Sequence, residues 1–327
     1  MAMMVGESGV MQELRARVTR VARTSFTVLV EGESGAGKEL VAREIHARSP
    51  RHRGPFVAVN CAALVETLVE AELFGIEERT ATGVRGRRGK FEQADQGTLF
   101  MDEVADLSPS TQAKLLRVLQ DMTVERIGGY CSNKIDTRIV VATNRSLHDM
   151  VAAGRFRADL YYRLSGVEIV VPPLRSRRED IPLLVRHFLG LYSPTITMTV
   201  APNATEALVA FDWPGNVRQL GRVLERAVAL ASRPEISLAD LPDSLRHAGR
   251  KVLGEARYPD DSLRAWSSRY VHLVLARCGG NKRRACEVLD ISYHTLQAHL
   301  TYAPPPRAPE TEPPVAPERP AMFQAIL

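Results

Sequence analysis

The stretch Gly32-Glu-Ser-Gly-Ala-Gly-Lys38 decides the fold of this 327-residue chain. It lies between the β-branched run 26–30, which predicts a strand, and the segment 38–48, which predicts a helix. Glycines let successive backbone N–H groups turn toward one point, and the following helix adds the positive end of its dipole. A strand, a glycine-rich loop and a helix in this order predict a site for nucleotide phosphates. Taken alone, the glycines could also form a simple flexible turn.

Within this loop, Lys38 is expected to neutralise the β- and γ-phosphates of the nucleotide. Glu39 stands where Ser or Thr normally contacts Mg²⁺ in such loops. The residues expected to contact the nucleotide here are Gly32, Glu33, Ser34, Gly35, Ala36, Gly37, Lys38 and Glu39.

A second acidic pattern follows the phosphate loop. Leu99-Phe-Met-Asp-Glu103 is an apolar run that ends in two carboxylates. This is the form of a Walker B strand, in which Asp102 holds Mg²⁺ through its water shell and Glu103 polarises the attacking water. The alternative is a buried strand that ends in an exposed acidic turn. Because the run follows a phosphate loop, the pair favours nucleotide hydrolysis with Mg²⁺ as the cofactor.

Strand and helix patterns alternate through the first half of the chain. This alternation predicts an α/β domain whose parallel sheet is covered by helices on both faces. The further strands are expected at 56–59, 98–101, 138–142 and 167–171, with a helix at 109–121. After Pro172-Pro173 only helical patterns remain, at 180–192, 204–211 and 216–231, so a second, all-helical subdomain is expected.

Composition shifts suggest five segments. Residues 1–172 form the α/β part, 173–245 the helical subdomain, 246–261 a polar linker, and 262–302 a small helical domain. The segment 303–327 begins with eight prolines between positions 304 and 320, which predicts a disordered tail. No receiver, PAS or GAF pattern precedes the α/β part, so the protein is expected either to be controlled by a separate partner or to be part of a longer chain.

The charge and cysteine content limit the class of protein. A net charge of +5 and a pI of about 9.1 permit nucleic-acid binding without establishing it. Four cysteines without a CxxC pair indicate a reducing compartment and argue against a zinc ribbon. Because there is neither a signal-peptide pattern nor an apolar run long enough for a membrane helix, a cytoplasmic protein is expected.

The chain resembles the central domain of the sigma-54-dependent activators, the bacterial enhancer-binding proteins, over about residues 4–302. The motifs that carry the resemblance are GESGAGKELVAREIH (32–46), FVAVNCAAL (56–64), AELFG (71–75), GKFEQADQGTLFMDEV (89–104), QAKLLRVLQD (112–121), ATN (142–144), FRADLYYRL (156–164) and WPGNVRQL (213–220). The resemblance implies an AAA+ P-loop domain with an α-helical lid, ATP as the nucleotide, and assembly into a ring that is usually a hexamer. Glu39 is the family's usual residue at its position.

The resemblance also implies roles for single residues. Asn60 corresponds to the switch that holds the catalytic Glu103 until ligand arrives. Thr143 and Asn144 correspond to sensor I, and Arg218 in the lid to sensor II. Arg157 and Arg163 correspond to the arginine fingers, which reach into the neighbouring subunit's site, as phosphoryl transfer requires positive charge. For each arginine the alternative is a solvated surface charge.

One loop departs from the family. Activators of this family contact sigma-54 polymerase through a loop with the sequence GAFTGA. The corresponding residues here are Arg79, Thr80, Ala81, Thr82, Gly83 and Val84. Ala81 replaces the family's aromatic residue and Arg79 the leading glycine, and four more cations follow within twelve residues. Two interpretations stay open: the loop engages the same polymerase differently, or the protein no longer interacts with sigma-54 and regulates transcription in another way. The arginines either contact DNA or polymerase, or are solvated.

The segment 280–300 predicts a helix, a tight turn and a second helix. Asn281 and Ser292 are the expected N-caps, with Ala285, Val288 and Leu289 buried in the first helix. The segment resembles the Fis-type helix-turn-helix, whose second helix enters the major groove of DNA. A helical hairpin used for dimerisation is compatible with the same pattern. The expected DNA contacts are Lys282, Arg283 and Arg284 to phosphates, and Tyr293, His294, Thr295, Gln297 and His299 in the groove.

These features favour an ATP-driven transcription activator that remodels RNA polymerase carrying sigma-54 from an upstream DNA site. A DNA-bound regulator or repressor, in which ATP only controls oligomerisation, is the alternative that Ala81 favours. A metabolic P-loop kinase explains neither the arginine fingers nor the helix-turn-helix.

Overall fold

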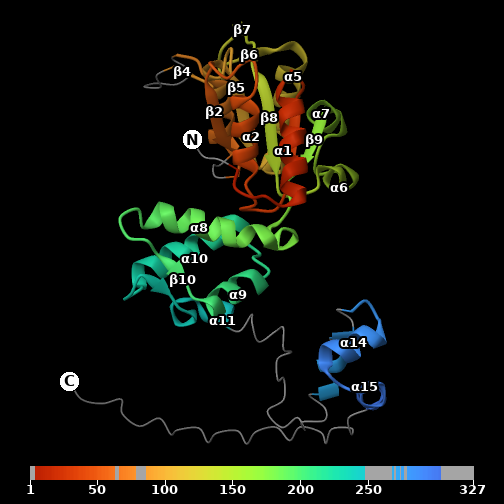
Figure 1. Ribbon diagram of the computed structural model, residues 1–327. Helices are drawn as coiled ribbons and strands as arrows, with labels where there is room; N and C mark the ends of the chain where they lie inside the picture. The colour runs from red at the N-terminus through yellow and green to blue at the C-terminus, as the bar shows by residue number, and fades with distance from the viewer. Residues whose placement is uncertain are drawn as a thin grey trace, which may run out of the picture. The chain divides into compact units, whose positions relative to one another are not determined.

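The computed structural model describes residues 4–62, 66–78, 86–246, 267–268, 270–272, 274–275 and 278–302. The chain divides into two compact units, Met1–Gly249 and Arg250–Leu327, and each is described by itself (Figure 1). The loop 79–84, the linker beyond Arg246 and the tail 303–327 lie outside the described residues.

The first unit is built on a five-stranded sheet in which every pairing is parallel. Its strands are β1 (Val28–Glu31), β2 (Phe56–Asn60), β5 (Thr98–Asp102), β8 (Arg138–Thr143) and β9 (Val167–Val170), in the order β2-β5-β8-β1-β9. The predicted parallel α/β sheet is therefore confirmed. The central strand β8 is buried along its whole length, which suits its β-branched sequence.

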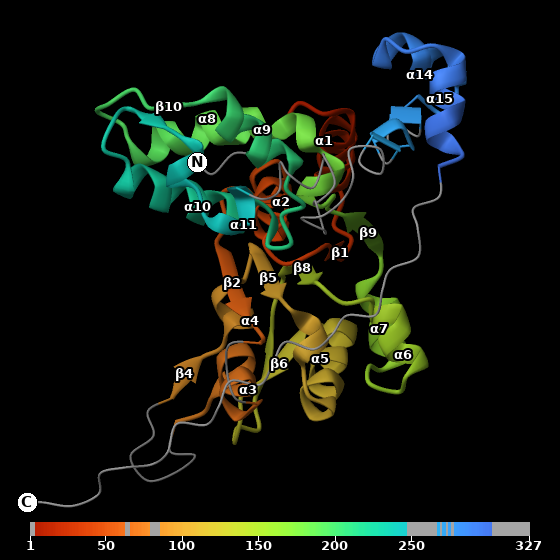
Figure 2. The same cartoon turned by 90° about the horizontal axis from the view of Figure 1, so that it is seen from below.

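Alternate side chains of the strands enter two separate cores, because successive residues of a strand point to opposite faces. Val140 and Ala142 of β8 pack in the core beneath α1 (Gly9–Ala22) and α2 (Lys38–Ala47). Ile139 and Val141 pack in the core on the other face. The helices of that face are α3 (Glu66–Phe74), α4 (Lys90–Gln93), α5 (Pro109–Asp121), α6 (Leu147–Ala152) and α7 (Ala158–Leu164), and Figures 1 and 2 show the two layers.

Local signals explain the bounds of α5, which match those expected from the sequence. Ser108 caps the helix, because its Oγ accepts a hydrogen bond from the Thr111 backbone N–H at 3.3 Å, and Pro109 occupies the first helical position. Met122, at φ 51°, ends the helix in the left-handed region.

Two short antiparallel hairpins had no counterpart in the sequence expectations. β3 (Gly75–Ile76) pairs with β4 (Arg87–Arg88), and β6 (Thr123–Glu125) pairs with β7 (Ser132–Lys134). Strands of two or three residues are too short to show the alternation of apolar and polar residues from which strands are predicted.

The lid follows the sheet and is mainly helical, as predicted. Its elements are η2 (Leu174–Ser176), η3 (Arg178–Asp180), α8 (Ile181–Tyr192), α9 (Pro202–Ala210), α10 (Asn216–Leu230), η4 (Leu238–Asp240) and α11 (Asp243–Arg246). It also contains a two-residue parallel pair, β10 (Thr199–Val200) with β11 (Glu235–Ile236), so the expectation of a purely helical subdomain was incomplete. Trp213 is fully buried in the lid core, and its indole N–H donates to the Leu208 carbonyl at 2.8 Å.

In the second unit the structure describes the helices α14 (Lys282–Leu289) and α15 (Tyr293–Leu300), and further helical residues at 267–268, 270–272 and 274–275. Both expected caps are present. Asn281 accepts from the Arg284 N–H at 3.2 Å, and Ser292 accepts from the Thr295 N–H at 3.1 Å. The expected burial of Val288 was wrong, because its side chain is 62% exposed. The small core, formed by Val271, Val274, Ala285 and Leu296, covers a narrow stripe of α14.

Candidate nucleotide site

The glycine-rich loop connects β1 to α2 and is fixed by a close approach of the lid. Gly35 has a φ of +75°, and a Cβ at this position would lie 2.4 Å from the Gly215 carbonyl oxygen. A larger residue would therefore clash as well as adopt a left-handed conformation. The Arg218 N–H donates to the Gly35 carbonyl at 3.3 Å, which ties the start of α10 to the loop.

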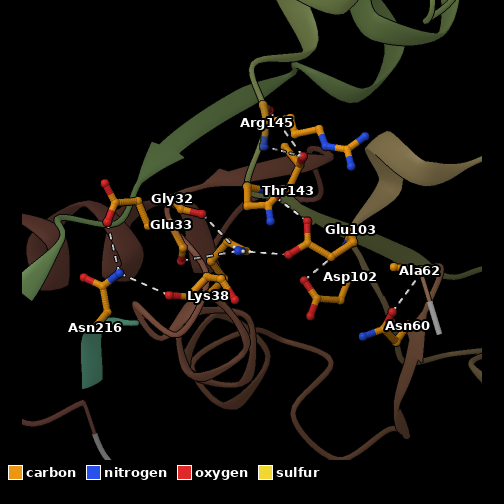
Figure 3. Close-up of polar contacts among 12 residues, drawn as sticks. Gly32, Glu33, Lys38, Asn60, Ala62, Asp102, Glu103, Thr143, Arg145 and Asn216 are labelled. Atoms are coloured by element: carbon orange, nitrogen blue, oxygen red, sulfur yellow. Dashed lines mark hydrogen bonds and ion pairs between the residues drawn. The ribbon is translucent and has the colours of Figure 1, made fainter. Parts of the chain in front are cut away.

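Lys38 opens α2 and points back across the loop. Its side chain is only 6% exposed. The ammonium Nζ donates to the Gly32 carbonyl at 2.9 Å and lies 3.3 Å from the Glu103 Oε1 (Figure 3). A buried ammonium at the start of a helix is suited to bind an anion.

Glu103 follows the end of β5 and is held from two sides. Its φ of 54° lies in the left-handed region, which non-glycine residues adopt mainly where surrounding structure enforces it. One carboxylate oxygen faces Lys38, and the other accepts a hydrogen bond from the Asn144 N–H at 3.0 Å. A carboxylate held in a fixed orientation beside a glycine-rich loop can act as a general base toward a bound water molecule.

Asp102 is the last residue of β5, and its carboxyl is partly buried. Burial raises the pKa of Asp102, and the neighbouring Glu103 carboxylate raises it further. Two adjacent carboxyls of this kind fit a divalent cation, because the cation stabilises their ionised forms. The described residues contain no group of three or more His, Cys, Asp or Glu side chains that could enclose a metal alone.

The carboxyl ends of neighbouring strands bring three further predicted residues to this edge of the sheet. Asn60 pairs in register with Asp102, and its Oδ1 accepts from the Ala62 N–H at 2.9 Å. Thr143 is buried at the end of β8, and its Oγ1 accepts from the Arg145 N–H at 3.0 Å. Asn144 follows directly and reaches Glu103 through its backbone N–H.

The lid contributes two contacts to the phosphate loop that sequence reasoning missed. Arg175 forms a bidentate ion pair with Glu33, at 2.7 and 2.5 Å. Asn216 donates to Glu33 and to the Ser34 carbonyl, both at 3.1 Å. Hydrogen bonds from Arg175 and then Asn216 lower the pKa of Glu33 to about 2. The signal was available, since Asn216 lies inside the WPGNVRQL motif beside the predicted Arg218.

Arg218 itself points toward the loop, with its Nη1 3.3 Å from the Ser34 hydroxyl. It lines a cavity of about 800 Å³ between the loop and the lid helices α8 and α10. Lys38, Glu39, Asn60, Asp102 and Glu103 line the same cavity. The structure thus gathers most of the predicted nucleotide residues around one space.

A second, mostly apolar cavity of about 530 Å³ adjoins the loop at Gly37 and Leu40. Its wall includes Met4, Val5 and Leu184. The N-terminal segment that carries Met4 is held in place by the lid, because Asp180 accepts hydrogen bonds from the Glu7 and Ser8 backbone N–H groups. The sequence contained no periodic signal for this cavity, since its residues come from four separate segments.

Comparisons with known proteins agree with this geometry. Residues 4–170 match the model of the Sigma-54 interaction domain, and residues 175–256 match the AAA+ ATPase lid domain. The transcriptional regulatory protein ZraR of Klebsiella oxytoca is 47% identical over 305 residues, which cover 91% of this chain and 68% of ZraR. The chain belongs to the sigma-54-dependent transcriptional activators.

Other members of the family show the same relationship. The regulatory protein AtoC of Escherichia coli is 44% identical over 304 residues, covering 90% of this chain and 66% of AtoC. The crystal structure of NtrX from Brucella abortus in complex with ADP superposes with a TM-score of 0.75 at 38% identity, covering 91% of this chain and 69% of NtrX. NtrX has also been solved with ATP. This sigma-54-dependent activator therefore has the AAA+ fold with a helical lid, and its family is one of ATPases.

The two predicted finger residues of this activator lie apart from its own phosphate loop. Arg157 precedes α7 and pairs with Asp159, at 3.1 and 2.8 Å. Arg163 lies in α7 and donates to the Leu119 carbonyl at 3.2 and 2.8 Å. The described residues that line the 800 Å³ cavity include neither arginine. Within one chain the structure does not bring them together with Lys38.

The predicted DNA contacts lie on the two described helices of the second unit. Lys282, Arg283 and Arg284 form the first turn of α14. Exposed side chains include Arg283, Arg284, Tyr293, His294 and Gln297, whereas Lys282, Thr295 and His299 are half-buried.

In the described part of the chain, no helix has the length and apolarity needed to cross a bilayer.

Proposed function

We propose that this chain is an ATP-hydrolysing, DNA-binding transcription regulator that remodels RNA polymerase holoenzyme containing sigma-54 from an upstream site. The observation that carries the proposal is the placement of Glu103 between Lys38 and Asn144, at the edge of a cavity large enough for a nucleotide. The solved complexes of NtrX with ATP and ADP support ATP as the ligand.

In this proposal each part of the site has one task. The loop from Gly32 to Glu39 binds the triphosphate through backbone N–H groups and Lys38, and the apolar cavity beside it accepts the base. Asp102 would hold Mg²⁺, which would supply positive charge to the phosphates. Glu103 orients and deprotonates the attacking water. Asn60 controls the position of the Glu103 side chain. Thr143, Asn144 and Arg218 respond to the γ-phosphate.

The fingers explain why hydrolysis is coupled to assembly. A subunit that carries Arg157 and Arg163 away from its own site supplies them to a neighbour in a ring, usually a hexamer in this family. Arginine on the transferring phosphoryl group accelerates such reactions by about 10³- to 10⁵-fold. We therefore propose that a monomer hydrolyses ATP poorly.

In this proposal each segment of the chain has its own role. Residues 1–172 hydrolyse ATP, 173–245 close over the nucleotide, and 246–261 connect to a Fis-type helix-turn-helix at 262–302, followed by the tail 303–327. The loop Arg79–Val84 contacts polymerase. The cations of α14 bind phosphates, and α15 reads the groove.

The DNA-binding proposal predicts the behaviour of a triple variant, Lys282→Ala with Arg283→Ala and Arg284→Ala. Loss of three phosphate contacts should weaken binding to DNA of any sequence and reduce the slope of log affinity against log salt by about 2 to 3. A gel-shift titration at several salt concentrations measures both. The matched control neutralises Arg17, Arg20 and Arg23 of the first unit. An unchanged salt slope in the first variant would place DNA contact elsewhere.

Ala81 supports a second candidate function, a DNA-bound regulator or repressor that no longer engages sigma-54 and uses ATP to control oligomerisation. Capture of purified sigma-54 in the presence of ADP and aluminium fluoride, resolved on native gels, separates the two. The activator proposal expects a stable complex that depends on the nucleotide mimic. The second function is favoured by a failure to form it, alongside a control activator that succeeds.

A further inference from the structure

A buried arginine lies where the sheet meets the lid. Arg177 stands between η2 and η3 and is only 3% exposed. Burial lowers the pKa of Arg177, and the charge of Asp180 acts in the opposite direction. The Asp180 oxygens accept hydrogen bonds from Glu7 and Ser8 instead. Because burying a guanidinium costs free energy unless its N–H groups find acceptors, the partners of Arg177 decide what it can do.

The guanidinium of Arg177 is incompletely satisfied. Its Nη2 donates to the Ala36 carbonyl of the phosphate loop at 3.1 Å. Its Nη1 lies 3.0 Å from the thioether sulfur of Met11, which is a weak acceptor. Among the described residues, the Nε N–H has no hydrogen-bond partner. Buried polar groups are nearly always well paired, so this guanidinium can still donate to a stronger acceptor.

A second buried arginine, Arg138, shows the arrangement that serves structure alone. It is also 3% exposed, and its Nε likewise has no partner among the described residues. Both of its Nη atoms, however, donate to backbone carbonyls at 2.8 Å, those of Val21 and Ala22 at the end of α1. Arg177 differs because one of its Nη atoms has only a sulfur as acceptor.

Arg177 and Met11 both line the apolar cavity of about 530 Å³ beside the phosphate loop. Other lining residues are apolar, among them Leu40, Val171 and Leu184. The described residues that line this cavity include no carboxylate, amide or hydroxyl side chain. A flat base can pack against such a wall, and its ring nitrogens would bring the acceptors that the wall lacks.

The position of Arg177 indicates which edge of the base it meets. Its bond to Ala36, the neighbour of Gly37, places the guanidinium on the side of the cavity that borders the phosphate loop. In a nucleotide whose base is anti to the ribose, the imidazole edge of a purine lies toward the 5′-phosphates. This edge carries the acceptor N7, whereas N1 and N3 lie farther from the phosphates.

We infer that Arg177 is a purine-recognition residue, whose guanidinium donates a hydrogen bond to N7 of the base in place of the Met11 sulfur. This inference rests on the proposed function, because it requires that the cavity holds the base. The unbranched Met11 side chain has the rotational freedom to release Nη1. Arg177 keeps its bond to Ala36, so base, phosphate loop and lid become joined through one side chain. Pyrimidine nucleotides have no N7 and would lack this contact.

The first test uses the wild-type chain and compares ADP with 7-deaza-ADP, in which a carbon replaces N7. Both displace a fluorescent ADP analogue that carries its label on the ribose. We expect 7-deaza-ADP to bind about 10- to 100-fold more weakly, the loss expected for a hydrogen bond from a charged donor. The control ligand 3-deaza-ADP keeps N7 and should bind within about threefold of ADP. No substitution is involved, so the result does not depend on the folding of a variant.

A variant then assigns the effect to Arg177. Arg177→Met removes the donors and keeps an unbranched side chain of similar length. Its affinities for ADP and 7-deaza-ADP should agree within about twofold, a loss of discrimination that a merely structural role of Arg177 would not produce. Arg138→Lys alters the other buried arginine and is the matched control, which should discriminate like wild type.

Each outcome decides a different point. Equal binding of ADP and 7-deaza-ADP by wild type would overturn the inference and leave the proposed function intact. Discrimination that persists in Arg177→Met would overturn it too, because another group would then contact N7. If wild type bound neither ADP nor the labelled analogue, the proposed function and the inference would fail together.

Discussion

Replacing Glu103 with glutamine should lower ATP turnover by about 100-fold or more while nucleotide still binds. Glutamine has nearly the same shape, and its amide oxygen can still accept the Asn144 N–H that Glu103 accepts at 3.0 Å. It cannot take a proton from water, and it loses the attraction to Lys38 at 3.3 Å. Turnover is followed by phosphate release, and binding by a fluorescent ADP analogue.

The control for this variant is Glu13→Gln, which neutralises an exposed carboxylate on α1. It should turn over ATP like wild type. If Glu103→Gln and wild type showed the same turnover at concentrations that support rings, Glu103 would not be the group that activates water. Loss of ADP binding in the variant would instead indicate a damaged site.

Mixing two inactive variants should restore activity. Arg163→Ala removes the proposed finger, and Lys38→Ala removes the phosphate-binding ammonium, so each alone should lose nearly all turnover. In mixed rings, an intact finger from a Lys38→Ala subunit meets an intact loop from an Arg163→Ala subunit. Random mixing in equal amounts places such a pair at about a quarter of the head-to-tail interfaces.

The mixing experiment also separates catalysis from structure. Arg163 donates two hydrogen bonds to the Leu119 carbonyl, so its removal could loosen α7 rather than remove a finger. Recovered turnover would show that the Arg163→Ala subunit still has a working loop. If mixed rings formed, as shown by cross-linking, and turnover stayed at the level of the single variants, the finger would not act in trans.

The sequence was sufficient for those parts of the site that local patterns specify. The strand, loop and helix around Lys38 and the apolar run ending at Glu103 each have a short-range signature. The structure also brings Asn60, Asp102 and Thr143 together, because the carboxyl ends of adjacent parallel strands meet at one edge; the sequence predicted the parallel sheet but not the order of its strands. The structure confirms the parallel sheet and the helical lid.

Other features depend on contacts between distant segments, which no local pattern encodes. The Arg175–Glu33 ion pair joins residues 142 positions apart, and Asn216 reaches the loop across 183. The β6–β7 hairpin is too short for an alternating pattern. Val288 was expected to be buried but is exposed. Helical periodicity predicts which face of a helix is apolar, but it does not predict how much of that face the core covers.

The most direct test of the central claim is ATP-driven opening of a sigma-54 promoter by its polymerase holoenzyme, followed by permanganate reactivity of unpaired thymines. The protein is added at a concentration that supports rings, so that an upstream site is not needed. The account predicts opening with wild type and ATP, and none with ADP or with Glu103→Gln. Steady ATP turnover without opening, on a promoter that a control activator opens, would contradict it and leave the DNA-bound regulator as the function of this chain.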